Sequence, residues 1–452
     1  NALTGQDNGQ ETLEMLQRAN LFIVPLDNER RWYRYHHLFA DLLRQRLHQN
    51  AASESWSVDE LHIRASKWYE ENGLRMEAFH HAAAANDIER AVRLVEGDGK
   101  SSQYMVTVTP VLNWLASLPT AILDAKPSLW VMFAGILTRA GQMSSVEPKL
   151  KAAEKALSGS EMTEKTRDLI GQIAAIRATL AVMQEQPEPI LVQARRALKY
   201  LHPDSLHIRT ITTCTMGYAY QLQEDRAAAS QAFSEAISNS QKTGDVVINI
   251  FASNGLGSVL ESENQLVLAA ENYQRVLQLA GDPPIPAACE AHAGLARIHY
   301  EWNDLDTAKQ HAKQGAKLGR QIDQVDTPAA CELILAQLQL AQGDVDSAAA
   351  HLAQADQFVR QQNFVALKPK LVAIQVLTRL RQGNLPAAAH LAEKHDLPLS
   401  VARVHLAQGE PAAALGVLGQ YRQAVEAKDW KDEQLKVMIL QAVALLKHGE
   451  KN

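Results

Sequence analysis

The side chains best equipped for chemistry lie in one short segment, residues 32–44, which reads Trp-Tyr-Arg-Tyr-His-His-Leu-Phe-Ala-Asp-Leu-Leu-Arg. It gathers aromatic rings, basic groups and the adjacent imidazoles of His36 and His37 at a higher density than core packing requires. Imidazole can exchange a proton near neutral pH and can bind a metal ion. Adjacent histidines point to different faces of a helix, and no acidic residue completes a ligand set. A metal site is therefore unsupported, and His36 could simply pack between the aromatic residues.

The other histidines and the cysteines give no stronger sign of a metal site or of catalysis. His80 and His81 are again adjacent, and His292 and His299 also lack an acidic partner that would complete a site. The three cysteines, at positions 214, 289 and 331, are 75 and 42 residues apart and form no CxxC pair. We expect them to be reduced core residues.

No motif of a known catalytic or nucleotide-binding site is complete. Gly99-Lys100-Ser101 imitates the end of a P-loop, but the loop needs a glycine five residues before Gly99, where Leu94 stands, and no strand precedes it. Neither HExxH nor GxSxG occurs. The sequence therefore predicts a chain that is not itself an enzyme.

Composition and charge limit the function classes. Among 452 residues, 46% are hydrophobic and 21% charged, which is typical of a globular protein, and the abundant alanine favours helix. The 45 basic and 51 acidic residues leave a net charge of −6, with no basic stripe that could neutralise a DNA backbone. No run approaches 18 apolar residues, and the N-terminus does not resemble a secretory signal. We expect a cytoplasmic protein that does not itself read DNA.

The elements that would position the aromatic and imidazole segment are those of a small winged helix. Residues 11–16 have helical spacing, and the apolar run at 21–24 is followed by a polar turn at 27–30. Residues 32–35 then alternate as a hairpin partner would, and a helix is predicted from about His37 to Leu47. Helix, two-stranded wing and helix is the order expected of a winged-helix module.

The rest of the chain is built from helical hairpins with a fixed period. Polar turns recur at Glu185, Glu224, Glu263, Asn303, Gly343 and Gly383, with steps of 39, 39, 40, 40 and 40 residues, and a step of 26 leads to Gly409. Five residues beyond several turns stand the small residues Ala229, Ala308, Ala348, Ala388 and Ala414. The period predicts a right-handed α-solenoid. It exceeds the 34 residues of a standard tetratricopeptide repeat (TPR), so that HEAT-type packing also fits the spacing.

Together with the lead-in Leu21-Phe22-Ile23-Val24-Pro25-Leu26-Asp27, the segment 32–44 resembles the winged-helix end of the nucleotide switch in MalT-like regulators. These are the large ATP-binding members of the LuxR family, within the STAND class. The solenoid resembles their TPR-like sensor. The resemblance implies an all-α fold with three parts: a winged-helix end of the switch at 1–55, irregular linking repeats at 56–160, and the sensor at 161–452. The chain would then be a piece of a larger regulator.

The resemblance assigns a role to His36. In related switches, a Met-His-Asp motif at the start of a winged-helix α-helix places its imidazole on the β-phosphate of ADP. Here His36 would contact that phosphate, His37 would replace the Asp, and Phe39 and Leu42 would face the winged-helix core. Such a contact fits a helix N-terminus, where a phosphate is already favoured. ATP or ADP would bind only in the full-length protein, whose missing N-terminal part would carry the P-loop.

The sensor would bind its effector on the concave surface lined by the first helix of each hairpin. Polar groups there that could contact a sugar or a peptide are Arg209, Thr212, Thr215, Tyr218, Asn249, Asn254, His292, Arg297 and Tyr300. By the resemblance, a small inducer or a protein would bind there, relieve an ADP-locked state and allow self-association. DNA would be bound only through a missing C-terminal helix-turn-helix. The alternative is a scaffold that binds a protein or peptide and has no small-molecule inducer.

Overall fold

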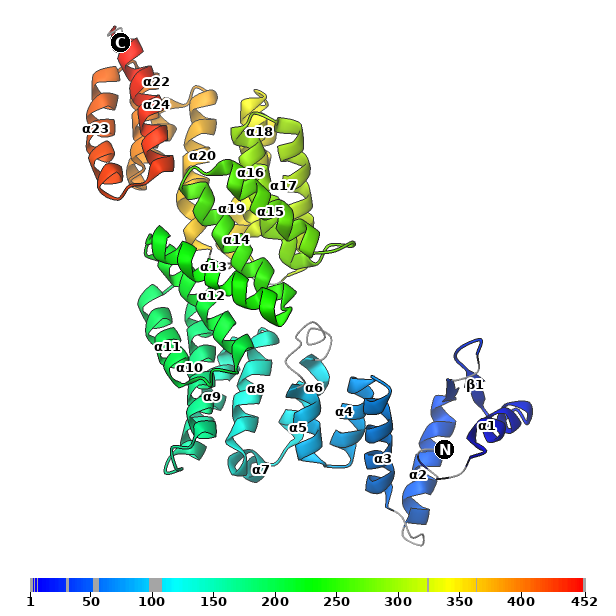
Figure 1. The fold of residues 1–452 in the computed structure, drawn as a ribbon. Helices are drawn as coiled ribbons and strands as arrows, with labels where there is room; N and C mark the ends of the chain where they lie inside the picture. Colours follow the sequence, from blue (N-terminus) through cyan, green and yellow to red (C-terminus); the bar gives the residue numbers. More distant parts are fainter. Residues whose placement is uncertain are drawn as a thin grey trace. The chain divides into compact units, whose positions relative to one another are not determined.

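The computed structural model describes Leu3, Gly5 and residues 7–29, 32–51, 57–96, 108–322, 325–362 and 364–449. The P-loop-like sequence at residues 99–101 lies outside the described residues. The chain divides into two compact units, residues 1–140 and 141–452. Regular structure in the described residues is almost entirely helical (Figure 1), as the fold-class prediction required. No described helix is both long enough and apolar enough to cross a lipid bilayer.

The first unit begins with the predicted winged-helix order. Helix α1 (Gly9–Arg18) precedes strand β1 (Ile23–Pro25), strand β2 (Tyr33–Tyr35) and helix α2 (His37–Ala51). The strands pair antiparallel, with Ile23 opposite Tyr35 and Pro25 opposite Tyr33. The hairpin therefore delivers the chain directly to the start of α2, which is where the imidazole segment lies.

Aromatic packing fixes the start of α2 against the hairpin. The Phe39 ring lies 5.4 Å from the ring of Phe22 and 5.9 Å from that of Tyr35. This confirms that Phe39 faces the winged-helix core. The same prediction for Leu42 is wrong, because its side chain is 51% exposed. Leu42 lies three residues beyond Phe39, on a part of the helix surface that the described residues leave uncovered.

The rest of the first unit is a short series of packed helices. They are α3 (Val58–Glu71), α4 (Arg75–Ala84), α5 (Ile88–Glu96), α6 (Val108–Ser117), α7 (Thr120–Ala125) and α8 (Pro127–Arg139). The buried Ser66 hydroxyl on α3 joins three of these helices, because it donates to the Ala78 carbonyl on α4 at 2.7 Å and accepts from Arg90 on α5 at 2.7 Å. Phe79 packs edge-on against Trp114, with ring centroids 5.5 Å apart.

The second unit is a series of helical hairpins. It opens with α9 (Val146–Leu157). The first helices of the following hairpins are α10 (Glu164–Val182), α12 (Leu206–Leu222), α14 (Val246–Ser262), α16 (Cys289–Glu301), α18 (Thr327–Ala341), α20 (Lys368–Arg381), α22 (Pro398–Gln408) and α24 (Lys431–His448). The second helices are α11 (Pro187–Tyr200), α13 (Arg226–Thr243), α15 (Leu266–Leu279), α17 (Leu305–Gly319), α19 (Val345–Gln362), α21 (Leu385–Lys394) and α23 (Pro411–Ala427). Short 3₁₀ turns occur at Met143–Ser145, Pro286–Ala288 and Val365–Leu367.

The turns inside the hairpins carry the predicted period. A left-handed residue occurs in each, at Glu185, Glu224, Asn264, Asn303, Gly343, Gly383 and Gly409. The third turn is centred one residue later than predicted, since Asn264 rather than Glu263 has the positive φ, at 58°. The next residue often caps the second helix, as Asp304 does by accepting from the Thr307 amide at 3.2 Å.

Small residues allow the helices of the solenoid to approach closely. All five predicted alanines are fully buried: Ala229, Ala308, Ala348, Ala388 and Ala414. From α10 to α22, each first helix packs against the next first helix as well as against its own partner. No comparable contact joins consecutive second helices in the described part of the chain. The solenoid therefore curves with its first helices on the inside, and they form its inner surface.

Two second helices carry a buried aromatic ring that is wedged between glycines. A Cβ on Gly257 would lie 2.5 Å from the Tyr273 ring, and one on Gly294 would lie 2.2 Å from it. One hairpin earlier, Phe233 lies in the same way against Gly217 and Gly255. Each ring touches its own first helix and the following one, and so joins neighbouring hairpins. Replacing these glycines would force overpacking.

Candidate functional site

His36 immediately precedes the first residue of α2, and its side chain is exposed. Its amide donates to the Phe22 carbonyl at 2.8 Å, and its own carbonyl accepts from the amides of Phe39 and Ala40 at 2.9 Å. The hairpin therefore holds His36 at the helix N-terminus, where partial positive charge favours an anion. The first turn of α2 contains no acidic residue that would oppose an anion. The His37 side chain lies outside the part of the chain that the structure describes.

The nine predicted effector-surface residues all lie on first helices, namely α12, α14 and α16. Several of them use their polar groups in hydrogen bonds within their own helices. Thr212 is 1% exposed, and its hydroxyl donates to the Ile208 carbonyl at 2.7 Å. Thr215 donates in the same way to Ile211 at 2.9 Å. The buried Asn249 accepts from Ser253 at 3.2 Å.

Arg209 and Asn254 join neighbouring elements. Arg209 donates to the carbonyls of Leu198 and Leu201, at 3.0 and 3.2 Å, at the end of α11. Asn254 donates to the Ala287 carbonyl at 3.3 Å, and its side-chain oxygen is buried without a partner among the described residues. Both side chains therefore fix backbone segments that adjoin their own helices.

Arg297 is the centre of a charged network on the inner surface. It makes a bidentate pair with Glu261, with both contacts at 2.8 Å, and a further contact of 3.3 Å with Glu290. The Tyr273 hydroxyl donates to Glu261 at 2.7 Å, and the Thr327 hydroxyl donates to Glu290 at 3.2 Å. Three first helices and the wedged tyrosine therefore meet in one network, which we call the Arg297 network.

Burial makes this network electrostatically unusual. The pKa of Glu290 is raised, mainly because burial disfavours its charged form. On α20, the pKa of Lys370 is lowered to about 8, first by burial and then by the positive charge of Arg297. Lys370 and Arg297 are nevertheless both partly exposed. Charged groups that are held poorly hydrated yet accessible are well suited to contact a polar ligand.

Sequence reasoning found Arg297 but missed its partners. Glu290 precedes Arg297 by seven residues, which places both on the same face of a helix, and Glu261 precedes it by 36 residues, close to one repeat. Counting positions across successive hairpins could have found both carboxylates. Nothing in the sequence identified Lys370, whose relation to the network depends on how α20 packs.

The two predicted tyrosines lie at other points of the inner layer. Burial and the negative charges of Glu185 and Asp326 raise the pKa of Tyr218 to about 12. The pKa of Tyr300 is also raised, mainly by burial. Each ring is partly buried against core residues. Each is therefore fixed in place with some of its surface still accessible.

His292 pairs with another histidine inside its hairpin. Its Nδ1 lies 2.9 Å from Nδ1 of His311 on α17, and the ring of His299 stacks on His311 with centroids 5.6 Å apart. Burial and the charge of His311 lower the pKa of His292 to about 4. One hairpin later, the equivalent positions hold Glu332 and His351, which pair at 2.7 Å. The described residues contain no group of three or more potential metal ligands.

The His292–His311 pair predicts an acid-sensitive solenoid. The pKa of His292 is lower in the fold than in the unfolded chain, so its stabilising contribution is complete above about pH 6.5 and declines as pH falls towards 4. Allowing for partial exposure, we expect a loss of about 1–2 kcal/mol in the free energy of unfolding between pH 7 and pH 4.5. Urea unfolding of the wild type and of His292→Gln across this range measures it. An equally steep pH dependence in His292→Gln would contradict the assignment.

Family profiles match two parts of the chain, which lie on either side of residues 56–170. One described as the MalT winged helix domain matches residues 1–55, and one described as the MalT-like TPR region matches residues 171–452. The HTH-type transcriptional regulator MalT of Serratia proteamaculans (strain 568) is 28% identical over 447 residues, which are 96% of this chain and 48% of that protein. MalT of Yersinia pestis (strain Pestoides F) is 27% identical over 76% of this chain and 38% of its own length. The chain therefore spans about half the length of these relatives, or less.

Solved structures support the fold alone. A STAND protein with a tetratricopeptide repeat sensor from Pyrococcus horikoshii superposes with a TM-score of 0.59 at 13% identity, over 98% of this chain and 62% of that one. A Rap protein complexed with competence and sporulation factor gives a TM-score of 0.57 at 13% identity, over 72% of this chain and 93% of that one. The profile matches show that the chain belongs to the MalT-like family, as a winged helix followed by a TPR solenoid.

Proposed function

We propose that this chain is the sensor portion of a signal-responsive, ATP-dependent bacterial transcription activator. The observation that carries the proposal is the union, in one chain, of a MalT winged helix domain and a MalT-like TPR region whose inner surface holds the Arg297 network. The relatives that align with most of this chain are named transcriptional regulators. In such a regulator, the ATPase and the DNA-binding helix-turn-helix lie outside this chain.

In the proposed mechanism, effector binding in the solenoid controls the nucleotide state of the switch. Without effector, His36 holds the β-phosphate of ADP at the N-terminus of α2 and keeps the regulator closed. An effector bound on the inner surface favours the open, ATP-bound state, in which the regulator self-associates and activates transcription. A coupling of about 1–3 kcal/mol between the two sites is sufficient for a switch.

Loss of the imidazole should release this lock. In a regulator that carries this chain together with its ATPase and DNA-binding modules, we expect His36→Ala to raise inducer-free transcription at least about fivefold, the lower end of typical allosteric couplings. A promoter–reporter assay without inducer measures it. His390→Ala, which alters an exposed histidine on α21, is the matched control and should leave the reporter unchanged. Equal reporter activity for His36→Ala and the wild type would remove the phosphate role.

A scaffold that binds a protein or peptide is the competing outcome, and calorimetry separates it. We expect heat of binding from at least one metabolite class in a panel titrated into the purified chain, and its loss in Tyr300→Ala. A chain that retains a protein partner in a pull-down but gives no heat with any metabolite would support the scaffold instead.

A further inference from the structure

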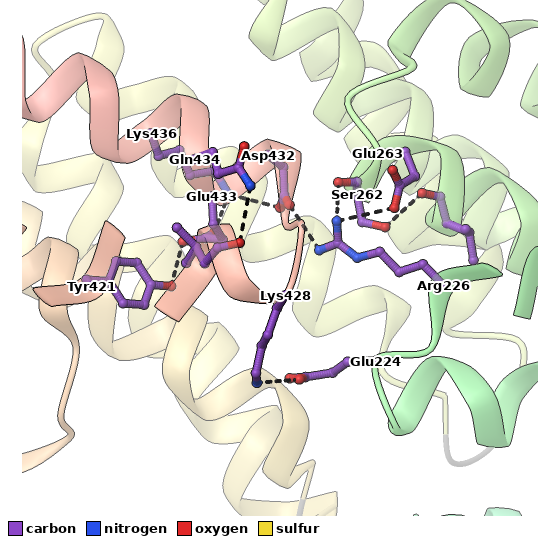
Figure 2. A network of polar contacts seen from close by, with 12 residues as sticks. Glu224, Arg226, Ser262, Glu263, Tyr421, Lys428, Asp432, Glu433, Gln434 and Lys436 are labelled. Atoms are coloured by element: carbon purple, nitrogen blue, oxygen red, sulfur yellow. Dashed lines mark hydrogen bonds and ion pairs between the residues drawn. The ribbon is translucent and has the colours of Figure 1, made fainter. Parts of the chain in front are cut away.

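Two ion pairs join parts of the solenoid that are more than 200 residues apart. Glu224 pairs with Lys428 at 2.7 Å, across 204 positions, and Arg226 pairs with Asp432 at 3.0 Å, across 206 positions (Figure 2). In a solenoid, each repeat ordinarily contacts only its neighbours. Other contacts here, such as that of Lys447 with the Leu406 carbonyl, span about one repeat. The second unit therefore returns on itself, so that distant hairpins meet.

The residues that meet lie at or beside the turns of the hairpins. Glu224 is the left-handed residue between α12 and α13, and Arg226 is the first residue of α13. Lys428 follows the last residue of α23, and Asp432 lies in the first turn of α24. The backbones of α14 and α24 also approach each other. The contact therefore joins two hairpin ends through short, fixed segments.

Arg226 connects three turns. It donates to the Ser262 carbonyl at 2.6 Å, lies 3.6 Å from the Glu263 carboxylate and pairs with Asp432 (Figure 2). The side chains of Arg226 and Asp432 are only 19% and 26% exposed. On α24, Lys436 shares Asp432 at 3.6 Å and also pairs with Glu433 at 2.8 Å. Each of these carboxylates therefore faces a cation.

An aromatic ring lies between the two cations. Lys428 Nζ is 4.1 Å from the centroid of the Trp430 ring, and Arg226 Cζ is 5.7 Å from it. Both distances suit cation–π attraction. Trp430 also packs against the core cluster formed by α22, α23 and α24. The indole therefore ties the contact to the last described hairpins.

We propose that Glu224, Arg226, Lys428, Trp430 and Asp432 form a reversible latch that holds the solenoid closed on itself and fixes the spacing of its inner helices. The outer pair, Glu224 and Lys428, is 49% and 53% exposed, and such pairs are weak and screened by salt. Closure therefore depends on a few polar contacts, with no continuous apolar interface described between the distant turns. A latch of this kind opens without unfolding the hairpins that carry it.

The latch and the Arg297 network meet at the end of α14. Glu261 pairs there with Arg297 at 2.8 Å, and the carbonyl of the next residue, Ser262, accepts from Arg226 at 2.6 Å. A ligand that displaced Glu261 or Arg297 would therefore act on the same helix end that the latch holds. The regulatory half of the inference, that effector occupancy shifts the latch between closed and open, rests on the proposed function.

Double electron–electron resonance (DEER) measures the distance between two nitroxide labels, and it tests the latch without any effector. The labels are placed on the whole chain at Ala227→Cys and Gln423→Cys, two exposed positions beside the latch, in a Cys214→Ser background. We expect a narrow distance distribution at low salt. Glu224→Lys should shift it to longer and broader distances, 1 M NaCl should do the same, and adding Lys428→Glu to Glu224→Lys should restore it. Arg360→Glu, which breaks an exposed pair within α19, is the control and should change nothing.

A distribution that responds neither to Glu224→Lys nor to salt, with unchanged circular dichroism, would overturn the latch. The regulatory half is measured separately, by a reporter in the intact regulator, where Glu224→Lys should change inducer-free activity at least twofold and Lys428→Glu should reverse the change. If DEER shows that Glu224→Lys opens the latch, but reporter activity is unchanged and still responds to inducer, only the regulatory role of the latch is overturned. A reporter that no variant and no inducer can move would instead count against the proposed function.

Discussion

Tyr273→Ala should lower the free energy of unfolding of the solenoid by about 3–5 kcal/mol. The Tyr273 side chain is fully buried, and its ring lies against Gly257 of its own hairpin and Gly294 of the next. Removing the ring leaves a cavity that the glycines cannot fill, because they have no side chains. The change also takes away the hydroxyl that donates to Glu261 at 2.7 Å. Urea unfolding followed by circular dichroism measures the loss.

Two variants separate the contributions of ring and hydroxyl. Tyr273→Phe keeps the ring and should lose about 1.5–3 kcal/mol, the contribution of a hydrogen bond to a charged group. Val267→Ala lies on the same helix, at a side chain that is 61% exposed, and should change stability by less than about 0.5 kcal/mol. If the free energies of unfolding of Tyr273→Ala and Val267→Ala differed by less than about 1 kcal/mol, the wedged ring would not be what joins the two hairpins.

Arg297→Met should lower the free energy of unfolding by about 2–3 kcal/mol at pH 7, somewhat less than for a fully buried pair. The methionine preserves much of the side-chain volume but leaves Glu261 and Glu290 without their shared cation. Burial already raises the pKa of Glu290, and loss of the cation would raise it further. Stabilisation that depends on its protonation is present at low pH and lost as pH rises. The deficit should therefore shrink between pH 7 and pH 5.

The matched control for this substitution is Arg360→Met. Arg360 pairs with Asp356 within one helix but is 76% exposed, so its loss should cost less than about 0.5 kcal/mol at either pH. Urea unfolding at pH 7 and pH 5 gives both values for both variants. A deficit in Arg297→Met that did not depend on pH would mean that lost packing, and not the unpaired carboxylates, causes it.

Local signals were sufficient to predict most of the fold. Alternation at residues 32–35, the polar turn before them and the helical spacing after them predicted the winged helix. The period of the turns predicted the hairpins, and the alanines five residues beyond the turns are buried as the spacing required. The turn at Asn264 shows the limit of counting, since the residue with positive φ lies one position beyond the counted Glu263.

The site was harder to predict because its geometry depends on packing between hairpins. Threonine on an inner helix reads as a ligand-binding group, yet the hydroxyl of Thr212 bonds to its own helix, as threonine often does. The ion pair between Arg297 and Glu261 joins two neighbouring hairpins. The approach of Glu224 to Lys428 depends on the curvature accumulated over all the hairpins between α12 and α23. Small rotations per repeat add up over such a distance, and no local pattern encodes their sum.

The central claim is that an effector acts on the inner surface of the solenoid, beside the Arg297 network. A crystal structure of the intact regulator, purified from cells in which its target promoter is active, tests this most directly. The account predicts ligand density on the first helices, within hydrogen-bonding distance of Arg297, Lys370 or Tyr300. An active regulator whose inner surface is empty, or whose ligand lies on the second helices, would contradict it.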